Sequence, residues 1–436
     1  MRVIADLHIH SRYSRATSAN MNIPDIARFA QIKGLTLVGT GDFTHPQWLR
    51  ELKENLSEVP GTGLYKPKSQ KFDIWFMITG EVSTVFSFGG KTKKIHHVIL
   101  TPSIEVAEQI NDRLSRYGSL EADGRPTLAM SAPHLVEEVM EVSRDNMVFP
   151  AHAWTPWFSL FGAFSGFDRI EDCYQDMTRH IHALETGLSS DPPMNWRLSS
   201  LDRFTLLSNS DSHSSWPWRI GREANVFELK QLTYWNIIES IRMNDSSALK
   251  FTIETDPAYG KYHWTGHRAC GVSLPPAEAI KLGNICPVCH RRLTKGVEQR
   301  VEELADRPYG FKPPNSPGYM HLLPLSEVIS AVIGASSPSS RKVWNIYNAL
   351  ISHFGNEYKV LIDADFNEIA KATDPLIAEA VIRVREGRVK VIPGYDGVYG
   401  QILIFPEENV GNVETAGRER EERIKSSRQK SLSDFF

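Results

Sequence analysis

Histidine and carboxylate side chains recur at the ends of apolar segments in the first half of the chain. Asp6, His8 and His10 alternate along one segment, so both imidazoles share a face of the expected strand and can reach one ion. Asp211 and His213 repeat this spacing. Imidazole and carboxylate together suit zinc, manganese or iron. The expected active-site ligands are His8, His10, Asp42, Glu81, His97, His152, Asp211 and His213.

This number of ligands is too large for one tetrahedral ion, so two or three divalent metals (Zn, Mn or Mg) are expected. Metals about 3.5–4 Å apart hold a phosphodiester, deprotonate a water and stabilise the leaving oxygen. The predicted reaction is metal-dependent hydrolysis that needs no covalent protein nucleophile. The residues expected to be catalytic are Glu81, His152, Asp211 and His213.

Three positions near these ligands remain open at this point. His45 is a replacement for Asp42 or an addition to it, and His96 is an alternative to His97. Glu185 is a candidate to support a ligand histidine from behind. The sequence does not decide between these alternatives.

Seven short apolar segments carry these residues, and helical or loop-rich stretches separate them. Helices are expected over 23–33, opened by Pro24 and Asp25, and over 133–144. Alternating strands and helices predict a parallel sheet, and polar residues at so many strand ends predict a barrel with its site on that face. The expected strand segments are 3–10, 35–45, 75–81, 96–101, 147–154, 181–187 and 204–213.

The chain of 436 residues is expected to have three parts. Residues 1–255 form the α/β barrel, residues 256–408 form a zinc-binding C-terminal region of α+β type, and residues 409–436 form a flexible, charged tail. Lys+Arg 49 against Asp+Glu 52 gives a net charge of −3, without the basic excess of many nucleic-acid binders. The sequence has no apolar run long enough to span a bilayer and no signal peptide, so a cytoplasmic protein without membrane contact is expected.

Two pairs of ligand residues in the second half predict a structural zinc site. Each pair has the two-residue spacing of a zinc hairpin, and 15 residues separate the pairs. His263 and His290 compete for the fourth ligand position, but His267 restores the hairpin spacing. The expected ligands of one structural zinc are His267, Cys270, Cys286 and Cys289.

The ligand motifs resemble those of the polymerase-and-histidinol-phosphatase (PHP) superfamily of metal phosphoesterases. DLHIH (6–10) matches its first motif and SDSH (210–213) its last, whereas TGDFTH (40–45) and AHAW (151–154) stand where many members carry T-D-H and A-H-P. The resemblance implies a distorted (β/α)7 barrel, and Asp42 occupies a position that is often His. The segment SRYSRAT (11–17) lacks a ligand His of many members, which leaves the third metal open. The ligands that the resemblance implies are His8, His10, Glu81, His97, His152, Asp211 and His213.

The last eight residues form a short hydrophobic motif at a polar terminus. Apolar residues spaced three apart at a free chain end have nothing to pack on and suit a pocket on a partner. The pattern Q-x-x-L-x-x-F-F resembles the peptide with which archaeal and eukaryotic repair proteins bind the PCNA sliding clamp. This resemblance implies a DNA substrate and a nucleoid-associated location. The residues of the motif are Gln429, Leu432, Phe435 and Phe436.

The ligand motifs, the zinc motif, PGYDGVYG (393–400) and the clamp peptide together resemble the endonuclease Q family of archaea over nearly the whole length. The resemblance implies a DNA repair endonuclease that cleaves 5′ of deaminated bases (hypoxanthine, uracil or xanthine) and of abasic sites, with damaged DNA and PCNA as partners. A PHP-type phosphatase of a small phosphorylated metabolite is the alternative. A non-enzymatic, clamp-associated DNA-binding protein is a third hypothesis.

Aromatic and arginine residues follow two of the ligand motifs. An enzyme that inspects a base takes it out of the stack and holds it against aromatic walls, although a hydrophobic lid has the same composition. Arg219 and Arg222 are close enough in sequence to the last ligand pair to bind a phosphate. The candidates for a base pocket are Trp154, Trp157, Phe158, Trp216 and Trp218.

Overall fold

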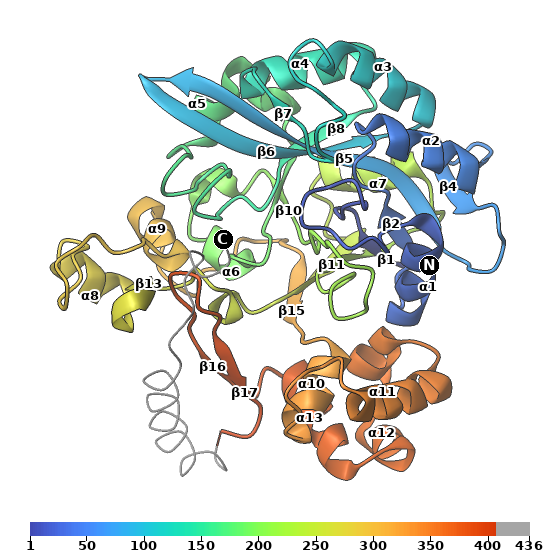
Figure 1. Cartoon of the computed structure of the whole chain (residues 1–436), viewed down its shortest axis with the longest axis vertical. Coiled ribbons are helices and arrows are strands. Elements are labelled where there is room, and N and C mark those ends of the chain that lie inside the picture. Colours follow the sequence, from blue (N-terminus) through green and yellow to red (C-terminus); the bar gives the residue numbers. More distant parts are fainter. Residues whose placement is uncertain (407–436) are drawn as a thin grey trace, which may run out of the picture.

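A computed structural model describes residues 1–406, and residues 407–436 lie outside the described residues. The expected tail (409–436) and its clamp peptide therefore fall outside this part of the chain (Figure 1). The strands are β1 (Arg2–Asp6), β2 (Leu37–Gly39), β3 (Leu56–Val59), β4 (Leu64–Pro67), β5 (Trp75–Phe88), β6 (Lys91–Thr101), β7 (Thr127–Leu128), β8 (Met147–Pro150), β9 (Ala183–Glu185), β10 (Thr205–Leu207), β11 (Ala224–Glu228), β12 (Leu249–Glu254), β13 (Thr265–His267), β14 (Val272–Leu274), β15 (Gly318–His321), β16 (Lys390–Ile392) and β17 (Gln401–Leu403). The α-helices are α1 (Ile23–Lys33), α2 (Pro46–Asn55), α3 (Ile104–Leu114), α4 (Ala132–Val142), α5 (Ile170–Tyr174), α6 (Pro192–Asn195), α7 (Tyr234–Arg242), α8 (Pro276–Lys281), α9 (Val297–Leu304), α10 (Leu325–Val332), α11 (Arg341–Phe354), α12 (Phe366–Ala372) and α13 (Pro375–Arg385).

The two helices predicted from a start signal at Pro24 and Asp25 and from helical apolar spacing are both present. Helix α1 spans the predicted range, because the Asn22 side chain accepts a hydrogen bond from the backbone N–H of Asp25, Pro24 occupies the first turn, and Gly34 ends the helix at a φ of 99°. The second predicted helix is α4, in which the Ser131 side chain caps the N-terminus. Short-range sequence signals are therefore sufficient to place both helices.

Each of the seven predicted strand segments contains a strand, but they do not form the predicted closed, parallel barrel. Strands β1, β2 and β5 are parallel neighbours, whereas β6 is antiparallel to both β5 and β8. Strands β9 and β10 form a separate sheet, and no hydrogen-bonded ring closes within residues 1–406. The reason for the reversal is the two-residue turn at Gly89 and Gly90, whose φ angles of 56° and 74° fold β5 directly back as β6. A parallel strand would need a crossover connection instead.

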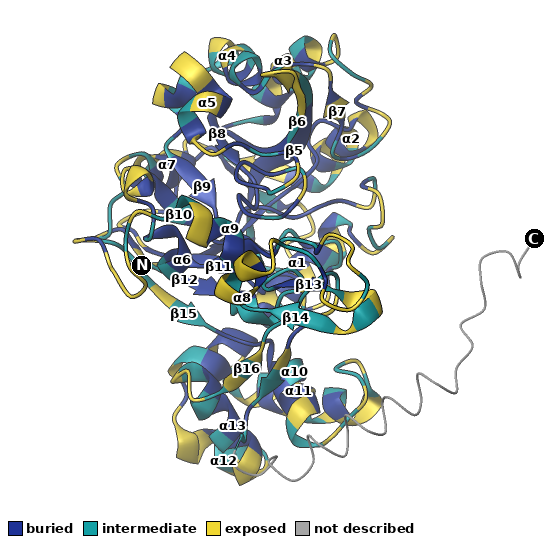
Figure 2. Cartoon of the chain, turned by 90° about the vertical axis from the view of Figure 1, so that its left-hand side faces the viewer, coloured by how far each residue is buried: buried dark blue, intermediate teal, exposed yellow. Residues whose placement is uncertain are grey.

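These strands nevertheless pack around one apolar core. Burial is strongest in this part of the molecule, which Figure 2 draws in dark blue. The core takes at least one buried side chain from each strand or its end, including Ala5, Leu37, Met77, Val98, Phe149, Ala183 and Leu207. Packing around this core therefore brings the polar strand ends to a common region, although the strands do not form a closed ring of hydrogen bonds.

The residues after β12 form three further units. The β13–β14 hairpin, α8, α9 and the segments between them carry the predicted zinc ligands, and we call this unit the zinc element (residues 256–304). Helices α10 to α13 make up the helical module (residues 324–388), which lies below β15 in Figure 1. The β16–β17 hairpin returns to the zinc element, where the backbone N–H of Trp264 donates to the carbonyl of Gly394 over 2.9 Å. None of the helices within residues 1–406 is long and apolar enough to cross a membrane.

Candidate metal centre

Glu81 on β5 lies at the centre of a buried cluster of imidazoles. Its Oε2 atom is 3.1 Å from Nε2 of His10 and 3.5 Å from Nε2 of His8, and its Oε1 atom is 3.2 Å from Nε2 of His152. Oδ1 of Asp211 lies 2.9 Å from Nε2 of His10. The potential ligand atoms form two groups, and within each group all atoms lie within 4.8 Å of one another. Glu81 belongs to both groups. The groups are His8, His10, Glu81 and Asp211, and Glu81, His96 and His152.

Unpaired polar atoms in this cluster fit a bound cation. Nε2 of His8, Nε2 of His10 and Oδ1 of Asp211 are buried and have no hydrogen-bond partner. Buried polar atoms without partners are costly in a folded protein unless an ion or water satisfies them. A carboxylate shared by two groups of nitrogen and oxygen donors is also the arrangement that two adjacent divalent metals require.

The electrostatics of the cluster keep its carboxylates ionised. Burial raises the pKa of Glu81, but the neighbouring Arg125, His96 and His8 outweigh it and hold that pKa well below its usual value. Burial also raises the pKa of Asp211, yet the close approach of His10 and the charge of His8 hold it low. Both carboxylates are therefore negatively charged near neutral pH, as metal ligands must be.

Three of the predicted ligands have a strained backbone conformation. Asp42, His152 and Asp211 have φ angles of 48°, 30° and 47°, in the left-handed region that residues other than glycine rarely adopt. Such conformations persist only where the surroundings enforce them, and they cluster at functional sites.

Asp42 and Glu185 contact the outer nitrogens of the cluster histidines. Asp42 Oδ1 lies 2.9 Å from Nδ1 of His10. Burial raises the pKa of Asp42, but the charge and hydrogen bond of His10 bring it below its usual value. Glu185 lies 3.0 Å from Nδ1 of His8 and accepts a hydrogen bond from the backbone N–H of His152 over 2.8 Å. Both carboxylates hold cluster imidazoles by their outer nitrogens, so Asp42 lies behind the cluster and not among its inner donors.

The structure separates the neighbouring residues His96 and His97. Nδ1 of His96 is 3.0 Å from Oε1 of Glu81. His97 points to the other face of β6, because successive strand residues alternate, and its nitrogens lie 2.8 Å from the Tyr174 hydroxyl and 2.9 Å from the Thr84 hydroxyl. Burial lowers the pKa of His97 to about 3. His96 therefore takes the place of His97 in the ligand set that we propose.

His45 and His213 lie at the edge of the cluster. The His45 ring stacks on Tyr13, with ring centroids 4.4 Å apart, and is not one of the grouped donors. The ring of His213 lies 4.4 Å from that of His10, and its Nδ1 atom is 2.9 Å from the Asp211 carbonyl oxygen. His213 is thus positioned beside the first donor group, although the structure does not include it in that group.

Arginines surround the cluster, and one of them was not predicted. Arg219 and Arg222 line a pocket of about 300 Å³ together with Asp211 and His213. Nη1 of Arg125, in the loop before β7, lies 3.0 Å from Oε2 of Glu81. No sequence spacing links Arg125 to the ligand motifs, because the long-range fold brings its loop to the site.

The aromatic candidates differ in exposure. Trp154 is buried and donates to Asn195 over 2.8 Å, so it is part of the core. The Phe158 ring lies 4.9 Å from His96, directly beside the cluster. Trp157 is exposed and stacks on Phe164. The remaining pair, Trp216 and Trp218, stack on each other with centroids 5.0 Å apart.

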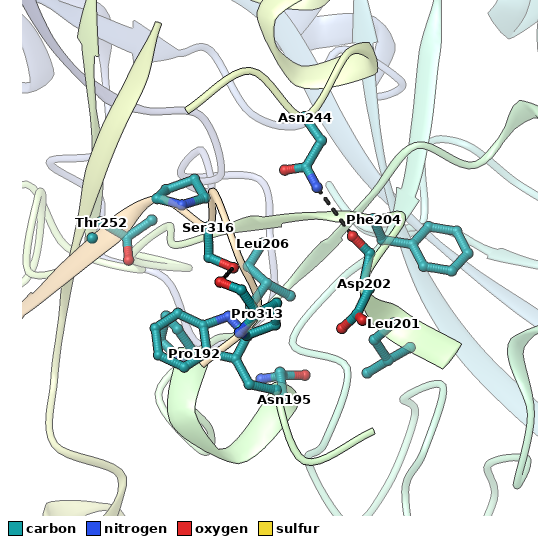
Figure 3. A pocket seen from close by; sticks show the side chains of 13 residues that line it. Pro192, Asn195, Leu201, Asp202, Phe204, Leu206, Asn244, Thr252, Pro313 and Ser316 are labelled. Carbon is teal, nitrogen blue, oxygen red and sulfur yellow. Dashed lines mark hydrogen bonds between the residues drawn. The ribbon is translucent and has the colours of Figure 1, made fainter. Parts of the chain in front are cut away.

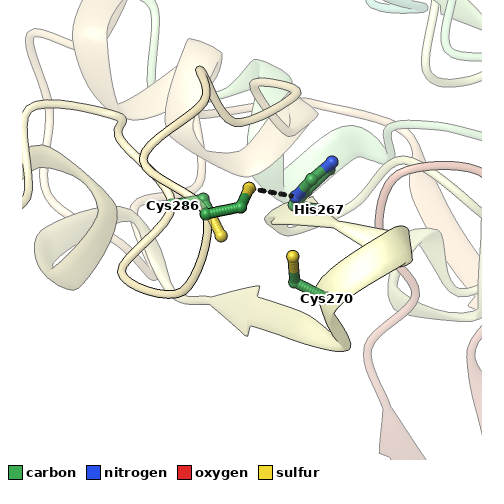
Figure 4. Close-up of side chains that lie close together, drawn as sticks. His267, Cys270 and Cys286 are labelled. Carbon is green, nitrogen blue, oxygen red and sulfur yellow. Dashed lines mark hydrogen bonds between the residues drawn. The ribbon is translucent and has the colours of Figure 1, made fainter.

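The zinc element brings together the four residues predicted as its ligands (Figure 4). Their ligand atoms lie within 4.8 Å of one another, and Sγ of Cys289 is 3.3 Å from Nδ1 of His267. His263 instead lies 3.3 Å from Glu298. One imidazole and three sulfurs at these positions fit a tetrahedral zinc ion. The four residues are His267, Cys270, Cys286 and Cys289.

A small cavity away from both candidate metal sites is lined mainly by apolar side chains. This cavity of about 30 Å³ lies between α6, β10 and the loop before β15 (Figure 3). Its rim is held by hydrogen bonds from Asn244 to the Asp202 carbonyl and from Ser316 to the Pro313 carbonyl. None of the grouped metal-binding donors within residues 1–406 lines it.

Solved structures of endonuclease Q are similar to this chain over nearly its whole length. The lesion-specific endonuclease PfuEndoQ from Pyrococcus furiosus superposes with a TM-score of 0.83 at 34% identity, covering 96% of this chain and 99% of that one. Endonuclease Q in complex with a 27-mer duplex substrate with an abasic lesion at the active site superposes with a TM-score of 0.82 at 34% identity, covering 95% and 100%.

Sequence comparison also finds a longer relative that matches only part of this chain. The uncharacterized protein MJ0043 of Methanocaldococcus jannaschii is 36% identical over 265 residues, which are 59% of this chain but 32% of that protein. The chain thus spans about a third of the length of this relative. Residues 324–388 match the family model of the MJ0043 C-terminal domain, and this range is the helical module.

Proposed function

The chain belongs to the endonuclease Q family, and we propose that it is a metal-dependent DNA repair endonuclease. It cleaves the phosphodiester on the 5′ side of deaminated bases (hypoxanthine, uracil or xanthine) and of abasic sites. The observation that carries the proposal is the pair of donor groups that share Glu81, because this arrangement suits two-metal hydrolysis of a phosphodiester. The similarity to a lesion-specific endonuclease supports the choice of DNA as the substrate.

The side chains of the cluster divide into donors and supports. His8, His10 and Asp211 would hold one divalent metal (Zn, Mn or Mg), His96 and His152 would hold another, and Glu81 belongs to both donor groups. Such metals supply an activated water for in-line attack on phosphorus and stabilise the leaving 3′ oxygen. His213 is a further donor candidate for a third metal.

The supporting residues fix geometry and charge around the reacting phosphate. Glu185 and Asp42 hold the outer nitrogens of His8 and His10, so that the inner nitrogens face the donor groups. Arg219 lines the pocket beside Asp211, where its guanidinium can bind a phosphate oxygen of the substrate strand. Phe158, beside His96, is our candidate wall for an unstacked base.

Two further features complete the proposal. One structural zinc, bound by His267 and three cysteines, holds the zinc element, which is too small to have a large core of its own. The C-terminal peptide with Leu432 and Phe435 recruits the protein to the PCNA clamp. Its residues lie outside the described part of the chain, so its sequence pattern alone supports this step.

A cleavage assay over a panel of duplexes tests the proposed function. The duplexes carry hypoxanthine, uracil, xanthine, an abasic site or no lesion, and a sequencing gel locates the nick. We expect metal-dependent nicks on the 5′ side of each lesion and none in the undamaged duplex. Fast hydrolysis of phosphomonoesters without nicking would instead establish the phosphatase, and binding without hydrolysis of either substrate would establish a DNA-binding protein.

A further inference from the structure

Lys33 is a buried lysine that joins the helical module to the loop after the last ligand pair. It ends α1, and its Nζ atom donates to Glu357 over 2.7 Å and to the carbonyl oxygen of Pro217 over 2.9 Å. The side chains of Lys33 and Glu357 are 2% and 0% exposed. Pro217 belongs to residues 214–222, which we call the site loop because they connect His213 to β11.

Glu357 also accepts hydrogen bonds from two helices of the helical module. Its Oε1 atom accepts the backbone N–H of Leu325, at the start of α10, over 2.9 Å. Its Oε2 atom accepts the hydroxyl of Tyr347, on α11, over 2.8 Å. Breaking a buried, hydrogen-bonded ion pair leaves an uncompensated charge, so the module and the site loop are held in one relative position.

A second contact fixes the far end of the site loop. The Tyr358 hydroxyl donates to the carbonyl oxygen of Gly221, and the backbone N–H of Gly221 donates to the buried Asp6 over 2.8 Å. Gly221 has a φ of 61°, and a Cβ atom there would lie 2.9 Å from Cγ of Lys33. The loop is therefore packed too closely against Lys33 to accept a side chain at this position.

The middle of the site loop meets the module through aromatic rings and an ion pair. Trp216 and Trp218 each lie within 5.6 Å of the ring of Trp344 on α11, measured between ring centroids. Arg222 lies 3.3 Å from Glu327 on α10. Contacts with the module thus occur along the loop on both sides of Arg219, which lines the pocket beside Asp211.

We propose that Lys33 and Glu357 are positioning residues for the active site, and that the helical module serves to hold the site loop so that Arg219 faces the substrate phosphate. The identity of the substrate in this inference rests on the proposed function. The positioning of the site loop by the module does not depend on it. The exposed pair Arg2 and Asp363 provides a matched control. It also joins β1 to the module, over 2.9 Å, and within residues 1–406 no side-chain hydrogen bond or ion pair links it to the site loop.

Steady-state nicking of the lesion duplexes tests the proposal through Glu357→Gln, Tyr358→Phe and the control Asp363→Asn. We expect Glu357→Gln to raise KM about tenfold, the size of one charge-assisted hydrogen bond to phosphate, with little change in kcat. Tyr358→Phe, the milder change, should act in the same direction, and Asp363→Asn should match the parent protein.

Combination with Arg219→Ala separates positioning from a general loss of stability. If Glu357 acts through Arg219, Glu357→Gln should have almost no further effect on KM in the Arg219→Ala background. An equal, independent rise in KM in both backgrounds would overturn the proposal.

Hydrogen exchange of residues 214–222 gives a readout that needs no activity. We expect the site loop to exchange faster in folded Glu357→Gln or Tyr358→Phe than in Asp363→Asn, while β10 stays protected. Unchanged exchange in the loop would overturn the proposal. If the parent protein does not nick lesion duplexes, the proposed function fails while the exchange result still decides whether the module positions the loop.

Discussion

The two candidate metal sites of this chain are assembled in different ways. The zinc element takes its four donors from residues 267–289, one short stretch of chain. The cluster around Glu81 takes its donors from β5, β6 and the segments after β1, β8 and β10, which meet only when the strands have packed together. Local spacing therefore determines the first site, whereas strand direction and pairing determine the second.

The strongest test of this difference compares two neighbouring histidines of β6. We expect His96→Ala to reduce the nicking rate about a hundredfold or more, because loss of even an outer contact to a ligand costs 10–100-fold. We expect His97→Ala to leave the rate of the folded enzyme close to that of the parent protein. Nicking rates and metal content at equal concentrations of folded protein check both results.

The substitution of His97 should instead affect the stability of the fold. His97→Ala leaves the hydroxyls of Tyr174 and Thr84 without their buried partner and should lower the free energy of unfolding by about 1–3 kcal/mol. A large loss of nicking in folded His97→Ala, with a normal rate in His96→Ala, would show that β6 presents its other face to the metals.

A smaller effect is expected for the carboxylate behind the cluster. Asp42→Asn keeps the shape of the side chain but weakens its hold on Nδ1 of His10, so metal affinity should fall about tenfold and excess metal should restore the rate. Titration of Mn²⁺ into metal-free protein measures this change. A rate that excess metal does not restore would place Asp42 among the inner ligands after all.

The zinc element should affect hydrolysis less than the cluster does. Cys286→Ser should remove one equivalent of zinc and loosen residues 256–304, because a small metal-held element loses folding energy without its ion. The single-turnover rate on saturating DNA should stay near that of the parent protein. Metal analysis and proteolysis of the element check this, and abolished hydrolysis with intact metal at the main cluster would contradict it.

The smallest expected effect concerns a buried carboxylate outside both sites. Burial raises the pKa of Glu254 from 4.5 to about 7. The unfolded chain loses this proton at lower pH than the folded chain does, so Glu254 makes the free energy of unfolding fall as pH rises through this window. Glu254→Gln cannot ionise and should flatten the fall. Urea unfolding on both sides of the window measures it, and an unchanged slope would contradict the burial argument.

The sequence predicts those features that depend on nearby residues. Local sequence signals predict the caps of α1, the seven strand segments and the pairs around Cys270 and Cys286. In each case the residues that carry the signal lie within a few positions of the structure that they form. The His96 and His97 alternatives depend on which face of β6 turns inward, and the reversal at Gly89 and Gly90 decides that.

Other parts of the site carry no local signal. The approach of Arg125 to Glu81 and that of Glu357 to Lys33 join residues far apart in the chain. Tertiary packing alone creates these contacts, so neither motif nor spacing could identify them.

The central claim is that the cluster around Glu81 and Asp211 hydrolyses damaged DNA. The most direct measurement is the nicking of hypoxanthine, uracil and abasic duplexes by Asp211→Ala beside the parent protein, with DNA binding measured on the same samples. Loss of a ligand that contributes several kcal/mol predicts a rate at least about a thousandfold lower with DNA binding retained. Undiminished nicking by Asp211→Ala would contradict the account.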